Sequence, residues 1–189
     1  MKRTFIATIV GTIIIFIYQA LSWMALPIHQ NSMKYTSTQD SVLAMLNSAL
    51  PEDGFYMMPI PPPGTPQEDH EKFFEPYYGK PWAAVSFHKA MVDNMGSGMI
   101  VSFILNFFSV WIIVLVLTKA SGVFNTFSRR FWVTLAFSFF TLLQAPLMEW
   151  NWWQSPAHYI VPEIIDELLA CLLVGIWLGW YLGRTPKAA

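Results

Sequence analysis

Four long apolar runs constrain this chain more than any other feature. They cover residues 5–26, 99–118, 131–148 and 161–182, and only the last carries acidic residues, close to its start. A helix of about 20 apolar residues crosses the roughly 30 Å hydrocarbon layer of a bilayer. Only 12% of the 189 residues are charged, whereas soluble domains average about 25%. The runs therefore predict an all-α membrane protein, a bundle of four transmembrane helices.

Charge is distributed unevenly around these runs. On one side lie no acidic residues and the basic residues Lys2, Arg3, Lys119, Arg129, Arg130, Arg184 and Lys187. On the other side lie all 12 acidic residues, all four histidines and the remaining lysines. Because short cytoplasmic loops are enriched in Lys and Arg, this pattern predicts that both termini are cytoplasmic and that the intervening segments are extracytoplasmic. No Asn-x-Ser/Thr sequon occurs, which agrees with a bacterial inner membrane.

The runs divide the chain into three parts. We expect residues 1–26 to form the first transmembrane helix, residues 27–98 a small extracytoplasmic α+β insertion, and residues 99–189 the remaining helices with short loops. A signal peptide would also begin with Lys2, Arg3 and an apolar stretch. Since the stretch continues to a stop at Pro27, we favour a retained helix over a cleaved one.

The insertion has mixed secondary-structure signals. Apolar residues at helical spacing predict a helix over residues 39–50, and residues 54–60 and 82–88 have the composition of strands. Thr65, followed by Pro66 and by Glu68, has the form of a capping box that would begin a second helix. We expect the strands to pair, the connection being long enough for a parallel crossover, and the apolar face of the first helix to cover them.

Ionisable residues near the outer surface form the candidate site. A metal site would use His29, His158, Glu163 and Glu167, since carboxylates four residues apart on a helix face can chelate one ion. Glu149, Asn151 and Asp166 are further members of the same polar outer-face cluster. Ionisable groups at membrane depth indicate function, but acidic side chains at a helix start also stabilise that helix without any ligand.

Gly175, Gly179 and Gly183 recur every four residues on the last helix. Small residues at this spacing allow two helices to approach closely. We expect the partner to be another helix of the bundle, such as the first, where Ala7 and Gly11 have the same spacing. A homodimer through this last helix is the alternative.

Several short motifs lie at the outer ends of the runs. They are Trp23 to His29, Gly54-Phe55-Tyr56 with Pro59, Trp150-Asn151-Trp152, and Glu163 with Asp166. Together they resemble a loosely defined group of small bacterial inner-membrane proteins with four predicted transmembrane helices. That resemblance implies topology and envelope location, and it implies no activity or catalytic residue.

Two functions remain open. No nucleophile–base arrangement, glycine-rich phosphate loop or compact metal signature occurs, so the sequence assigns no catalytic residue or cofactor. It favours a structural or accessory protein whose partners are the lipid bilayer and another membrane or periplasmic protein, not nucleic acid. The alternative is a binding or transport site for a small solute, cation or metal. An enzyme would need a carboxylate beside a histidine, for example Asp166 or Glu167 facing His158.

Overall fold

A computed structural model of the chain describes residues 2–184, which fall into two compact units. The helical unit contains the residues up to 34 and those from 94 onward, and the small unit contains residues 35–93. The small unit is thus shorter than the predicted insertion of residues 27–98. Residues 27–34 belong to the helical unit because they pack against its helices.

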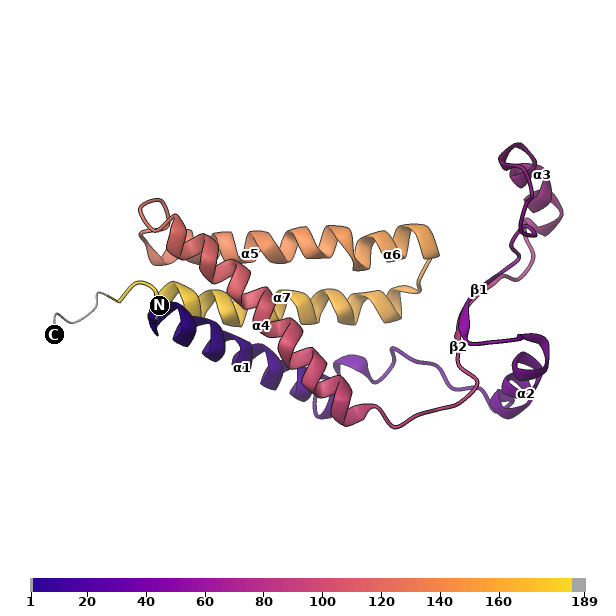
Figure 1. Cartoon of the computed structure of the whole chain (residues 1–189), viewed down its shortest axis with the longest axis horizontal. Coiled ribbons are helices and arrows are strands. Elements are labelled where there is room, and N and C mark those ends of the chain that lie inside the picture. The colour runs from indigo at the N-terminus through magenta and orange to yellow at the C-terminus, as the bar shows by residue number, and fades with distance from the viewer. Residues whose placement is uncertain (1, 185–189) are drawn as a thin grey trace. The chain divides into compact units, whose positions relative to one another are not determined.

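The helical unit is built from long helices that pack in a row. Its elements are α1 (Lys2–Met24), the 3₁₀ turn η1 (Pro27–His29), α4 (Met95–Lys119), α5 (Phe127–Gln144), α6 (Pro146–Trp153) and α7 (Ala157–Tyr181). α4 packs on α1, α1 on α7, and α7 on α5, while α4 and α5 have little contact (Figure 1). α1 and α7 therefore form the centre of the unit.

Three helical segments are long and apolar enough to cross a membrane: α1, α4 and the segment Phe127–Trp153, which comprises α5 and α6. Most of each segment is not buried inside the chain. Large apolar side chains such as Ile100, Leu105, Trp132 and Phe140 are exposed. Continuous apolar surface of this extent is typical of a protein that contacts lipid or a partner. α7 is 25 residues long and carries carboxylates in its N-terminal half.

Proline explains the break between α5 and α6. Ala145 leaves helical geometry with φ −116° and ψ −86°, and Pro146 begins α6. Proline has no N–H to continue the helix, and its ring clashes with the carbonyl four residues earlier. The two helices still share one long apolar segment.

α1, α4 and α7 meet at a tightly packed core. A Cβ atom on Gly11 of α1 would lie 2.8 Å from a methyl group of Val110 on α4, so only glycine permits this approach. The indole Nε1 of Trp177 on α7 donates a hydrogen bond to the carbonyl of Ala7 on α1, at 3.0 Å. Asn106 of α4 donates to Gln19 of α1 at 2.7 Å.

The glycine stripe of α7 faces α5, not the first helix. A Cβ on Gly175 would lie 3.2 Å from the ring of Phe131, and one on Gly179 would lie 2.8 Å from the ring of Phe127. Next to Gly183 lies the guanidinium of Arg130. The prediction that these glycines face α1 was therefore wrong. Trp177 lies on the side of α7 that contacts α1, and the glycines lie on the side that contacts α5.

The small unit contains a two-stranded antiparallel sheet. Its elements are α2 (Gln39–Ala49), β1 (Gly54–Met58), η2 (Gln67–Asp69), α3 (His70–Phe74), η3 (Glu75–Tyr77) and β2 (Ala83–Phe87). Gly54 pairs with Phe87 and Met58 with Ala83. The predicted parallel crossover was wrong, because the connection forms short helical turns and returns to the end of the sheet at which it left. A long connection permits either direction.

Two further expectations for the small unit were wrong. No residue of α2 is buried, so its apolar face does not cover the sheet. The capping box does not form either, because the Thr65 hydroxyl donates back to the carbonyl of Pro62, at 2.8 Å. Without a cap, the second helix is split into η2, α3 and η3.

Asp53 and Lys89 join the two ends of the hairpin. The Lys89 amide donates to an Asp53 carboxylate oxygen at 2.8 Å, and this bond lowers the pKa of Asp53 below its usual value. The Lys89 ammonium donates to the carbonyls of Asn47 and Leu50, at 2.9 and 2.7 Å. Lys89 thus attaches the end of α2 to the end of β2.

Candidate functional site

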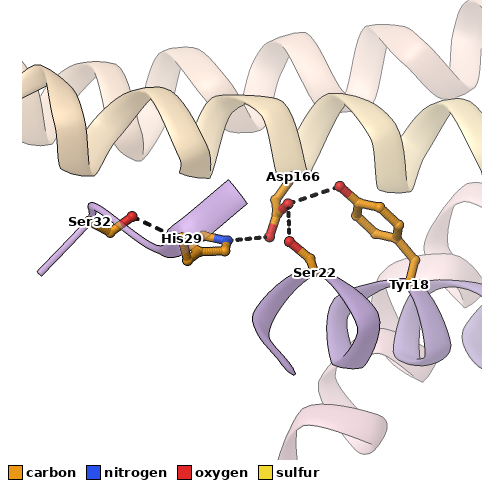
Figure 2. Close-up of polar contacts among 5 residues, drawn as sticks. All are labelled: Tyr18, Ser22, His29, Ser32 and Asp166. Atoms are coloured by element: carbon orange, nitrogen blue, oxygen red, sulfur yellow. Dashed lines mark hydrogen bonds and ion pairs between the residues drawn. The ribbon is translucent and has the colours of Figure 1, made fainter. Parts of the chain in front are cut away.

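The carboxylate of Asp166 accepts hydrogen bonds from three side chains of the helical unit. Its Oδ1 accepts from the Tyr18 hydroxyl at 2.8 Å and from the Ser22 hydroxyl at 2.6 Å. Its Oδ2 lies 2.9 Å from His29 Nε2. Figure 2 shows these groups converging on Asp166 from α1 and η1. The side chains of Asp166 and His29 are only 12% and 6% exposed.

The end of α1 determines the position of His29. Leu26 adopts an extended conformation before Pro27, as residues that precede proline usually do. The following 3₁₀ turn brings the chain back, so that the His29 ring stacks on Trp23 with 3.9 Å between ring centroids. Ser32 Oγ lies 3.4 Å from His29 Nδ1, on the opposite side of the ring from Asp166. These contacts give His29 one orientation.

Tyr18 and Ser22 lie one helical turn apart on α1, so both hydroxyls reach the same carboxylate oxygen. A buried carboxylate is stable when hydrogen bonds compensate for its lost hydration. Asp166 accepts two from hydroxyl groups and lies beside His29 Nε2. The Asp166 cluster, meaning Asp166 with Tyr18, Ser22 and His29, therefore connects α7 to α1 and η1.

A cavity of about 500 Å³ opens beside this cluster. It lies among α1, α4 and α7, and its polar wall includes Glu163, Asp166 and Glu167. These carboxylates occupy one face of α7 because they are three and four residues apart. The opposite walls are mainly apolar and come from α1 and α4, with Phe16, Trp23, Met24, Met95 and Met99 among them.

The lining of the cavity is negative and aromatic. Among the described residues that line it there is no Lys, Arg or His, and of its three carboxylates His29 contacts that of Asp166. Glu167 accepts a hydrogen bond from the Cys171 thiol, at 3.7 Å, whereas no described residue donates a hydrogen bond to Glu163. Carboxylates beside aromatic faces are suited to organic cations. The cavity can therefore accommodate a small positively charged group.

The predicted metal ligands do not gather into one group. Within residues 2–184, no group of three or more His, Cys, Asp or Glu side chains is arranged to hold a metal ion. Glu163 and Glu167 line the cavity, and His29 contacts Asp166 instead of either glutamate. His158 lies outside the cavity lining. Beside Asp166 the histidine is thus His29 and not His158.

The other predicted members of the outer-face cluster lie apart from the cavity lining. Glu149 accepts a hydrogen bond from Ser155 at 2.9 Å, which joins α6 to the turn before α7. Asn151 is exposed on α6. Asp166 is the one residue of that cluster that contacts both His29 and the cavity.

Sequence reasoning missed Tyr18 and Ser22 as parts of the site. Tyr18 and Ser22 are polar residues four apart in an apolar run, and that spacing on one helix face was the available signal. Nothing in the sequence indicated that this face would meet Asp166, 144 residues from Ser22.

Comparison of the chain with protein-family models, with curated proteins and with solved structures finds no match.

Proposed function

We propose that this chain is a multi-pass protein of a bacterial inner membrane, with four transmembrane helices and both termini in the cytoplasm. Three apolar helical segments of sufficient length support this location. α7 would be the fourth span, since it packs between α1 and α5 and has a comparable length. The orientation rests on the uneven distribution of charge.

We propose further that the cavity beside the Asp166 cluster binds a small organic cation. Of the two functions that the sequence left open, the geometry favours the solute site over the accessory role. The observation that carries this proposal is a single cavity lined by Glu163, Asp166 and Glu167 with no basic residue in its described lining. Trp23 and Phe16 supply aromatic faces for the cation. A bare metal ion is disfavoured because no described ligand group surrounds one point.

Paired probes test the charge requirement. We expect benzylamine, which is protonated at neutral pH, to bind the full chain purified in a neutral detergent, and benzyl alcohol of nearly the same size to bind far more weakly. Isothermal titration would measure both affinities. Glu163→Gln and Glu167→Gln should each weaken benzylamine binding about tenfold, the effect of losing one charge-assisted contact.

Glu75→Gln is the matched control, because Glu75 is an exposed carboxylate of the small unit and does not line the cavity. It should leave benzylamine affinity unchanged. Equal binding of the alcohol and the amine, or equal losses in all three variants, would show that the cavity does not select a cation.

The accessory role remains the second candidate because of one observation in the small unit. No residue of α2 is buried, and Val42, Leu43 and Met45 are exposed. Such a surface can pack against a partner protein or the membrane surface. A stoichiometric partner in the purified preparation, together with no benzylamine binding, would favour this role.

A further inference from the structure

The opposite end of the helical unit carries a second polar cavity, of about 420 Å³. It lies where α1 begins, α4 ends, α5 begins and α7 ends, and Arg3, Arg130 and Arg184 all line it. Hydroxyl and amide side chains complete its polar wall, and no Asp or Glu side chain is among its described lining residues. Three arginines thus line one cavity whose described lining has no carboxylate side chain.

Backbone carbonyls hold these arginines in place. The buried Arg130 donates from Nε to the carbonyl of Gly179 at 3.0 Å and from Nη1 to that of Phe124 at 2.9 Å. Arg3 Nη2 donates to the carbonyls of Tyr181, at 3.1 Å, and of Arg184. The carbonyls at the C-terminus of α7 carry partial negative charge. This charge offsets the repulsion between the neighbouring arginines.

These bonds leave many donors free. A guanidinium has five N–H donors in a planar fork. Arg3 Nε and Nη1 and Arg130 Nη2 have no acceptor among the residues that the structure describes. The Arg184 guanidinium stacks on the Trp180 ring at 3.6 Å, which leaves its N–H edges available. The unused donors match an acceptor that has several negatively charged oxygens.

We propose that this arginine cavity, defined by Arg3, Arg130 and Arg184, binds a phosphate group. Arginine forks match phosphate oxygens in pairs. The phosphate can belong to a lipid headgroup or be free in solution. This proposal is independent of the one for the cavity beside the Asp166 cluster, because the two cavities share no lining residue.

Three ligands distinguish the possible sources. The full chain, purified in neutral detergent and depleted of lipid, would be titrated with dioleoyl phosphatidic acid, with dioleoylglycerol, which lacks the phosphate, and with inorganic phosphate. Native mass spectrometry measures the bound lipid. We expect the phosphatidic acid to bind and the dioleoylglycerol not to bind. Competition by inorganic phosphate would show that free phosphate also enters, and its failure to compete would assign the site to a headgroup.

Variants locate the binding. Arg3→Gln and Arg184→Gln should each weaken phosphatidic acid binding about tenfold or more. Arg129→Gln is the matched control, since Arg129 is exposed and does not line the cavity, although its guanidinium bonds to the lining residue Asn125 as well as to the carbonyl of Val123. Arg184 is exposed, so its variant should fold even if the Arg3 variant does not. Absence of phosphatidic acid binding, or an equal loss in the Arg129 variant, would overturn the proposal.

Discussion

At the scale of single residues, Asp166 accounts for how α1 and α7 are held together at one end. Its carboxylate accepts from two hydroxyl groups and contacts one imidazole, and all three donors come from the segment that contains α1 and η1. Removing an acceptor from a buried group of donors costs more free energy than the intact bonds contribute. Substitutions at Asp166 should therefore separate charge from hydrogen bonding.

Asp166→Asn should be mild and Asp166→Leu severe. In the Asn variant, the amide oxygen can still accept from Tyr18 and Ser22, while the amide nitrogen donates to a neutral His29. We expect a loss of about 1 kcal/mol of unfolding free energy for Asn and about 3 kcal/mol for Leu, which leaves all three donors unpaired. Thermal unfolding of the purified chain in detergent would rank the variants.

Glu163→Gln, one turn earlier on α7, is the control for this series. Since no described residue donates a hydrogen bond to Glu163, its variant should unfold at nearly the parental temperature. If the Asp166→Leu variant unfolded at the same temperature as the Glu163→Gln variant, the Asp166 cluster would contribute no stability.

At the scale of elements, the contact between α5 and α7 depends on glycine. The Gly179 position has no room for a Cβ, because the Phe127 ring occupies the space at 2.8 Å. A Cβ on Gly175 would lie 3.2 Å from the ring of Phe131. Close approach of the backbones gives dispersion contacts along the whole helix pair, the main source of helix association in a bilayer.

Gly179→Ala should destabilise the chain by about 2 kcal/mol, because overpacking forces the ring or the helices to move. Thermal unfolding measures the loss. Gly96→Ala on α4 is the matched change, since a Cβ there meets nothing within 4 Å, and it should leave stability unchanged or slightly higher.

A second substitution tests whether the Phe127 ring is the obstacle. Combining Gly179→Ala with Phe127→Leu should cost less than the sum of the two single losses, since the smaller side chain vacates the space. Strict additivity would place the strain elsewhere.

At the scale of the whole molecule, charge separates the connecting segments into two classes. The loop between α4 and α5 lies near basic residues and contains no acidic residue, while residues 35–93 contain most of the carboxylates. The two cavities have opposite charge, since carboxylates line the one beside Asp166 and arginines line the other.

Cysteine labelling tests the orientation. In a Cys171→Ala background, a membrane-impermeant maleimide applied to intact spheroplasts should label Ser37→Cys and not Gly122→Cys. Both positions are exposed, and we expect Ser37 outside and Gly122 in the cytoplasm. Permeabilised spheroplasts are the control, in which both variants should react. Labelling of Gly122→Cys in intact spheroplasts would reverse the orientation.

Although the break at Ala145 within the expected helix 131–148 was not predicted, the sequence located the long helical segments to within about five residues, because long apolar runs favour a helix. It also located helix 39–49 and both strands to within about two residues. These features depend on local composition and spacing. The carboxylates on one face of α7 were predictable for the same reason.

Tertiary structure alone decided which surfaces meet. Both α1 and α7 carry small residues at a spacing of four, yet Trp177 of α7 lies against α1 while the glycines of α7 lie against α5. The strand direction depended on the path of a long connection, which permits either pairing. His29 contacts Asp166 instead of the predicted glutamates because the turn at Pro27 returns it to α7. Such contacts join residues more than 100 positions apart, so they depend on the packing of whole helices, which local spacing does not determine.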